Sequence, residues 1–185
     1  MPPLKTPICD FGLKAKDFHL NSTSNKITTL NDIRGDNGTL IMFICNHCPY
    51  VKAVIKDIVE DCESLKKYGI KAVAISSNDA VNHPEDSFDN MVKFSKNHKF
   101  NFPYLYDQTQ ETAKIYDAVC TPDFFGFNKN LELEYRGRFR ELKDLKPINN
   151  GESDLYKAMK KISETDKGPK EQVPSMGCSI KWFNT

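Results

Sequence analysis

The sequence predicts an α/β protein with a mostly parallel sheet and helices on both faces. Apolar patterns typical of strands and of helices alternate along the chain. Residues 40–44 form a continuous apolar run, as expected of a central strand buried on both faces. The 185 residues include 39% hydrophobic and 11% aromatic residues, enough for the core of one domain. The expected order is β-α-β-α, an inserted β-α, then β-β-α, with right-handed crossovers and an antiparallel hairpin at one edge.

The first half of the chain gives three of these elements. Residues 1–38 read as an N-terminal extension with short β segments, interrupted by a polar turn at 21–25. After the strand at 40–44, apolar residues spaced by three and four predict an amphipathic helix over about residues 49–68. Pro49 suits the first turn of that helix and Gly69 its end.

The second half supplies the remaining elements. Strands are expected at about 71–76 and 102–106, and helices at about 85–98, 109–117 and 154–163. An Asn-Lys-Asn turn between residues 123–127 and 131–136 predicts a β-hairpin. We expect one domain over residues 1–163, including the N-terminal β extension. An irregular C-terminal tail is expected over residues 164–185, because this stretch holds two prolines and two glycines.

Charge and hydropathy exclude several classes of function. Lysine and arginine number 26 against 25 aspartates and glutamates, and this near balance argues against a nucleic-acid or anionic-membrane partner. There is no run of 18 apolar residues for a transmembrane helix, and the first residues, MPPLKTP, do not form a signal peptide. We therefore expect a cytoplasmic protein.

Two of the six cysteines form a CxxC motif, Cys45-Asn46-His47-Cys48, between the buried strand and the predicted helix. Free N–H groups at a helix N-terminus favour an anion, so a thiolate there gains stability and becomes nucleophilic. His47, if protonated, would stabilise the thiolate further. The two intervening residues let the sulfurs approach disulfide distance. The motif therefore predicts a redox-active pair rather than two ordinary buried thiols.

A zinc site is the other common use of CxxC, and the sequence does not favour it. Zinc needs four ligands, usually from a second CxxC or a closely spaced histidine pair. The remaining cysteines stand alone along the chain, and so do the remaining histidines. We expect no metal and no organic cofactor, and Cys62 to belong to the core.

A Thr-Pro dipeptide supports the redox interpretation. Thr121-Pro122 precedes the apolar strand at 123–127, and a proline there marks the entry of a strand. A buried strand, CxxC at a helix start and a later Thr-Pro before a hairpin resemble the thioredoxin superfamily. Within it, the chain resembles the peroxiredoxin-like proteins (alkyl hydroperoxide reductase and thiol-specific antioxidant), here with a CxxC motif. The resemblance covers about residues 10–163.

The resemblance implies a thioredoxin fold with an N-terminal β extension and a β-α insertion, at about 102–117, before the cis-Pro hairpin. It implies that Pro122 is cis and faces the sulfurs, and that Thr121 contacts bound substrate. The candidate catalytic residues are Cys48 and Cys45. The candidate substrate-binding residues are Thr121, Pro122, His47 and Pro49.

The roles of the two cysteines depend on how the chain is aligned to the family. One register places Cys48 at the peroxidatic position, and leaves Ile41 and Cys45 where peroxiredoxins carry the proline and threonine of the peroxide pocket. A register shifted by three makes Cys45 the nucleophile and Cys48 the resolving cysteine. We favour Cys48, because it precedes Pro49 at the helix cap. Candidates for the pocket arginine, by position alone, are Arg136, Arg138 and Arg140.

The expected activity is that of a thiol-disulfide oxidoreductase with a peroxiredoxin-like, antioxidant role in cell redox homeostasis. Its partners would be a protein disulfide or a hydroperoxide as substrate, and an external thiol reductant such as a thioredoxin system. A thiol peroxidase and a non-catalytic redox-sensing or binding module are the alternatives. Cys120 is an auxiliary thiol or a structural one, and Cys178 is a second resolving cysteine or an inert tail thiol.

Overall fold

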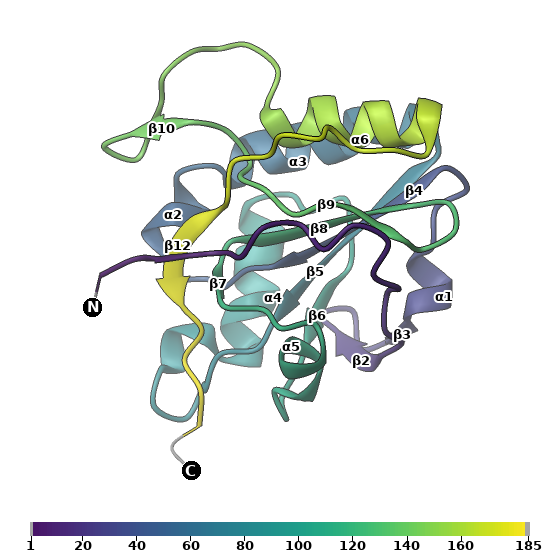
Figure 1. Cartoon of the computed structure of the whole chain (residues 1–185). Helices are drawn as coiled ribbons and strands as arrows, with labels where there is room; N and C mark the ends of the chain where they lie inside the picture. Colours follow the sequence, from purple (N-terminus) through teal and green to yellow (C-terminus); the bar gives the residue numbers. More distant parts are fainter. Residues whose placement is uncertain (1, 184–185) are drawn as a thin grey trace.

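A seven-stranded mixed sheet forms the centre of the computed structural model, which describes residues 2–183 (Figure 1). Residue 1 of the predicted domain and residues 184–185 of the predicted tail lie outside the described residues. The strand order is β3-β2-β6-β5-β4-β8-β9. Their bounds are β2 (His19–Ser22), β3 (Ile27–Thr29), β4 (Gly38–Phe43), β5 (Ile70–Ser76), β6 (Tyr104–Tyr106), β8 (Asp123–Asn128) and β9 (Leu133–Tyr135).

The expectation of a mostly parallel sheet is wrong. β4 pairs in parallel with β5, and β5 with β6, but the other neighbours are antiparallel. The reason is that hairpins flank the parallel centre on both sides, β2–β3 from the N-terminal extension and β8–β9 from the late hairpin. The α/β class and the thioredoxin-type arrangement, with the N-terminal β extension and the inserted β6–α5 unit, are as predicted.

Helices cover both faces of the sheet because strand side chains alternate between two cores. Leu40 and Met42 of β4 pack with the helices α3 (Ile55–Leu65), α4 (Phe88–Asn97) and α6 (Asp154–Thr165). Ile41 and Phe43 face the opposite core, which includes α1 (Leu30–Ile33) and α5 (Glu111–Ile115). All six residues of β4 are buried, as the apolar run predicts.

The predicted helix over residues 49–68 is interrupted. It consists of α2 (Pro49–Lys52), α3 and the 3₁₀ turn η1 (Lys66–Tyr68), and Gly69 ends it in the left-handed conformation. Val54 leaves helical geometry at φ −125° and ψ −3°. The helix predicted at 85–98 is likewise divided into η2 (Pro84–Asp86) and α4, which Ser87 caps.

The expectation of an irregular tail is wrong at β12 (Met176–Ser179). This strand lies between β1 (Leu4–Lys5) and β7 (Cys120–Thr121) in a small antiparallel sheet. In Figure 1, the yellow β12 arrow runs beside α2 and β7. The pairing joins residues far apart in the sequence, which local patterns do not reveal. A short hairpin of β10 (Leu142–Lys143) and β11 (Lys146–Pro147) precedes α6.

Within residues 2–183, every helix is too short or too polar to span a membrane.

Candidate redox site

The two cysteines of the CxxC motif meet the Thr121-Pro122 loop at one end of β4. Cys45 follows β4, and Cys48 occupies the N-cap of α2. The peptide bond between Thr121 and Pro122 is cis, as expected. The Cys45 sulfur lies 3.4 Å from the Thr121 hydroxyl, and the Cys48 sulfur 3.1 Å from the Thr121 carbonyl oxygen. The structure thus brings both sulfurs onto one residue of the predicted substrate loop.

Burial distinguishes this pair from an open active site. The exposed fractions of Cys45 and Cys48 are 1% and 0%. Thr121 and Pro122 are buried as well, while His47 is half-buried and Pro49 is exposed. Both sulfurs are therefore covered by the surrounding residues.

The two cysteines differ in the pKa of their thiols. A hydrogen bond from the Cys45 thiol lowers the pKa of Cys48 to about 5, against the opposing effect of burial; hydrogen bonds from Thr121 and Cys178 add to the lowering. The same bond to Cys48, then burial and the charge of Asp86, hold the pKa of Cys45 well above its usual value. The Thr121 carbonyl accepts a hydrogen bond from the protonated Cys48 thiol and so favours the protonated form of Cys48. This contact limits the difference in pKa between the two cysteines. Cys48 is the more acidic sulfur.

His47 is held by a buried carboxylate rather than by the sulfurs. Its Nδ1 lies 2.6 Å from Oδ2 of Asp86 and 4.0 Å from the Cys45 sulfur. Because a carboxylate only accepts, Nδ1 carries the proton and donates it to Asp86. The direct stabilisation of a thiolate expected of His47 is therefore weak on the Cys45 side.

Asp86 organises the whole CxxC loop. It is fully buried and accepts hydrogen bonds from the backbone N–H of Asn46 (2.8 Å) and from the Asn78 side chain (2.7 Å). Asn46 in turn accepts a hydrogen bond from the Tyr104 hydroxyl at 2.9 Å. Asp86 was not among the site residues predicted from the sequence. Its position in the chain could have indicated it, because it lies in the segment after β5, and the carboxyl end of β5 adjoins that of β4 in a parallel pair.

Cys45, His47 and Asp86 offer three ligand atoms within 4.8 Å of one another, a possible metal group that the sequence analysis did not identify. The spacing within the group is nevertheless that of a hydrogen bond. Neighbouring ligands of a tetrahedral zinc ion, each bound at about 2.1 Å, lie about 3.4 Å apart, whereas the nearest ligand atoms of His47 and Asp86 are separated by 2.6 Å. The arrangement fits an imidazole–carboxylate pair better than a metal centre.

The three candidate arginines are all engaged elsewhere. Arg136 pairs with buried Asp123 at 3.0 Å, Arg138 with Asp154 at 2.6 Å and Arg140 with Asp57 at 3.5 Å. Arg138 and Arg140 do line a cavity of about 180 Å³ that also reaches Pro122, Tyr50 and Met176. This cavity adjoins the redox loop at Pro122.

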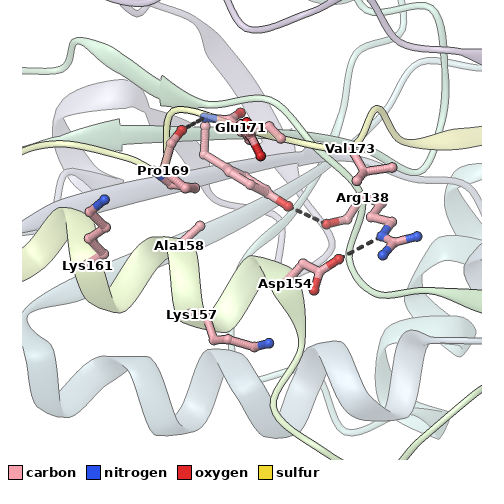
Figure 2. Close-up of a pocket in the computed structure, with 10 residues that line it drawn as sticks. Arg138, Asp154, Lys157, Ala158, Lys161, Pro169, Glu171 and Val173 are labelled. Carbon is pink, nitrogen blue, oxygen red and sulfur yellow. Dashed lines mark hydrogen bonds and ion pairs between the residues drawn. The ribbon is translucent and has the colours of Figure 1, made fainter.

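A larger cavity, of about 650 Å³, lies between α6 and the segment at residues 169–173 (Figure 2). Its lining combines Arg138 and Asp154, joined by an ion pair, with Lys157, Lys161 and Glu171. No cysteine lines it, so it is not part of the redox site.

The profile of the AhpC/TSA family matches residues 11–137 of the chain. The search of curated proteins finds no match.

Two solved structures resemble the entire chain. An uncharacterised conserved protein from Geobacillus kaustophilus is 41% identical, with a TM-score of 0.90, over 100% of this chain and 98% of that one. A hypothetical protein from Sinorhizobium meliloti 1021 is 32% identical, with a TM-score of 0.90, over 100% of both chains. Peroxidoxin BcpB from Mycobacterium tuberculosis shares the fold only, at 15% identity and a TM-score of 0.56, over 66% of this chain and 81% of that one.

Proposed function

The chain belongs to the AhpC/TSA family, and from this premise we propose that it is a thiol-disulfide oxidoreductase with Cys48 as nucleophile and Cys45 as resolving cysteine. The observation that carries the proposal is the meeting of both sulfurs at Thr121, with Cys45 3.4 Å from its hydroxyl and Cys48 3.1 Å from its carbonyl oxygen. In this arrangement a hydrogen bond from the Cys45 thiol lowers the pKa of Cys48 to about 5. A thiolate is therefore available at Cys48 at neutral pH, with its resolving partner in contact.

The proposed cycle exchanges one disulfide for another. The Cys48 thiolate attacks one sulfur of a substrate disulfide, and the other sulfur leaves as a thiolate that takes up the proton of Cys45. The Cys45 thiolate then attacks the Cys48 sulfur, breaks the mixed disulfide and releases the second substrate sulfur as a thiolate, which takes a proton from water. The substrate gains two electrons, and the chain ends with a Cys45–Cys48 disulfide that an external dithiol must reduce.

Thr121 and Pro122 are the proposed substrate contacts, because Thr121 contacts both sulfurs and the cis peptide bond joins it to Pro122. His47 and Pro49 complete the site from the CxxC loop, where Asp86 fixes the orientation of His47. We also propose a cytoplasmic location, since a dithiol reductant such as a thioredoxin system is available there.

A thiol peroxidase is the second candidate, and the family match favours it. In that reaction the Cys48 thiolate attacks a hydroperoxide oxygen, the alcohol or water leaves, and the resulting sulfenic acid condenses with Cys45 with loss of water. Ile41 and Cys45 stand where the family's pocket proline and threonine are expected, and the candidate arginines are paired with carboxylates. These features favour disulfide exchange over fast peroxide reduction.

A timed oxidation tests the proposal. The reduced protein receives one equivalent of hydroxyethyl disulfide or of hydrogen peroxide, is blocked by alkylation at intervals, and is mapped by mass spectrometry. We expect a Cys45–Cys48 bond from both reagents, faster with the disulfide. At the earliest time point, Cys45→Ser should carry a mixed disulfide on Cys48, whereas Cys62→Ser, a core substitution, should behave as the wild type.

Three results would redirect the assignment. A faster reaction with peroxide supports the peroxidase. Trapping on Cys45 in Cys48→Ser, with none on Cys48 in Cys45→Ser, reverses the roles. Formation of the bond without turnover in the presence of a thioredoxin system indicates a redox-sensing module.

A further inference from the structure

The edge of the substrate loop is already occupied by the chain's own C-terminal strand. β12 pairs antiparallel with β7, which places Cys178 opposite Thr121 and Ser179 opposite Cys120. An extended substrate would use this same backbone edge, because an open strand edge recruits another strand through its N–H and C=O groups. Cys178 therefore stands where a substrate cysteine would stand.

Specific contacts hold β12 against the loop. A Cβ at Gly177 would collide with the carbonyl oxygen of Thr121, so only glycine permits this close approach. Before the strand, the Ser175 hydroxyl donates to the Pro122 carbonyl at 2.7 Å. After it, the Lys181 N–H donates to the Asn78 side chain at 2.9 Å, and Asn78 also binds Asp86. The strand is thus fixed at both ends to the redox site.

Contact and exposure set Cys178 apart from the other cysteines. Cys178 packs against the buried cluster that contains Cys45 and Cys48, and its backbone and thiol help to lower the pKa of Cys48. It is half-buried, whereas Cys45, Cys48 and Cys120 are buried. The Cys120 thiol points elsewhere, toward the Pro122 carbonyl at 3.6 Å. Of the thiols grouped at this site, Cys178 is the one that solvent reaches.

We propose that Cys178 is a third redox-active cysteine, which exchanges disulfides with Cys48 and carries the oxidising equivalent from the buried pair to the surface, where a protein dithiol reduces it. This proposal rests on the proposed function of Cys45 and Cys48. It identifies Cys178 as the exposed thiol of the same site and a protein dithiol as the reductant that acts there.

The exchange of disulfides between Cys45, Cys48 and Cys178 needs no oxidant or reductant besides the protein dithiol. The Cys178 thiol loses its proton and attacks the Cys48 sulfur of the Cys45–Cys48 disulfide; the Cys48–Cys178 bond forms, and Cys45 leaves and takes up a proton. The reductant then attacks the Cys178 sulfur and expels the Cys48 thiolate. A second thiolate of the reductant releases Cys178 and closes the reductant's own disulfide.

The pKa values of Cys178 and Cys48 favour this order of steps. Burial, and then the hydrogen bond and charge of Cys48, raise the pKa of Cys178 to about 11. The last two influences vanish once Cys48 is in a disulfide, so Cys178 deprotonates more readily in the oxidised protein. Attack at Cys178 expels Cys48, whose low pKa makes it the better leaving group.

Peptide mapping gives the first test. Reduced Cys45→Ser protein is oxidised with one equivalent of diamide, which converts two thiols into a disulfide and is itself reduced to the hydrazine. We expect a Cys48–Cys178 bond within the same chain. Adding Gly177→Ala, which pushes β12 from β7, should reduce its yield by about fivefold or more, because a disulfide requires close Cβ atoms. Absence of the bond in Cys45→Ser overturns the proposal.

Reduction kinetics give the second test. In Cys178→Ser, excess diamide should still form the Cys45–Cys48 bond, but reduction of that bond by thioredoxin should slow by at least about tenfold, since the reachable sulfur is gone. The matched control is Cys9→Ser, which removes another half-buried thiol whose pKa is raised, and it should not slow reduction. Equal reduction rates in Cys178→Ser and wild type overturn the relay.

These outcomes separate the two proposals. If the wild type forms no Cys45–Cys48 bond with any oxidant, the proposed function fails, whether or not Cys48 and Cys178 can be joined. If that bond forms and turns over normally in Cys178→Ser, only the relay fails.

Discussion

At the scale of single residues, neighbours determine the chemistry of Cys48 more than the helix that follows. α2 has only four residues, so the helix end expected from the sequence is short. The groups that lower the pKa of Cys48 are the Cys45 thiol, Thr121 and Cys178, which come from three separate parts of the chain. Nucleophilicity at this site is thus a property of tertiary contacts.

The pH dependence of Cys48 alkylation tests this account. A pKa of about 5 means that the rate with iodoacetamide, followed by peptide mapping, rises through pH 5 and then levels off, because the thiolate is the reacting form. Restricted access of the reagent slows the absolute rate, but the pKa of Cys48 sets the midpoint. Cys9, whose pKa burial raises to about 12, should instead gain reactivity well into alkaline pH. A Cys48 midpoint above about 8, near that of a free thiol, would contradict the proposed proton sharing.

At the scale of secondary-structure elements, single polar side chains join helices that the sequence shows only as separate amphipathic segments. Ser153 caps α6 by accepting a hydrogen bond from the Tyr156 N–H at 2.9 Å. The same hydroxyl donates to Asp61 of α3 at 2.6 Å. One side chain therefore both starts α6 and fixes it to the neighbouring helix.

Replacing this cap should destabilise the protein measurably. Ser153→Ala removes the N-cap acceptor and leaves the Asp61 carboxylate without its donor, so we expect a loss of about 1–2 kcal/mol in the free energy of unfolding. Ser163→Ala, in the same helix, removes only a bond to the Lys160 carbonyl and should change stability by less than about 0.5 kcal/mol. Urea denaturation of both variants measures the difference, and equal losses would refute a joining role for Ser153.

At the scale of the whole molecule, a buried ion pair fixes the hairpin that carries the cis-Pro loop. Arg136 donates to both carboxylate oxygens of Asp123, at 3.3 and 3.0 Å, and its guanidinium also reaches the Asp117 carbonyl. It lies over the Phe125 ring, 4.4 Å from its centroid. This arginine is a structural tie between β8, β9 and the segment before β7, rather than a free peroxide-binding group.

Arg136→Met should therefore lower stability and leave the acidity of Cys48 unchanged. An uncompensated buried Asp123 is expected to cost about 3–5 kcal/mol at about pH 8. Burial already raises the pKa of Asp123, and losing Arg136 raises it further. The cost should shrink toward about pH 5, since protonation of Asp123 in the folded state relieves it as the pH falls. A stable variant with a shifted Cys48 alkylation midpoint would show that Arg136 acts on the sulfur instead.

Elements that depend on local patterns could be predicted from the sequence. The apolar run of β4, the CxxC motif after it and the Thr-Pro before β8 predicted the fold class and brought Cys45, Cys48 and Thr121 into one site. What the sequence misjudged depends on contacts between distant segments. The helix breaks at Val54, the sheet is mixed because hairpins flank its parallel centre, and β12 pairs with β7 although other elements separate the two strands in the sequence.

The tertiary structure alone decided which groups surround the sulfurs. Asp86 binds His47 and the CxxC loop because the carboxyl ends of β4 and β5 meet at one edge of the sheet. Cys178 reaches Cys48 because glycine at 177 allows β12 to approach the Thr121 backbone. Hydrophobic periodicity carries no information about such pairings, since a single glycine or a single buried carboxylate leaves no periodic pattern in the sequence.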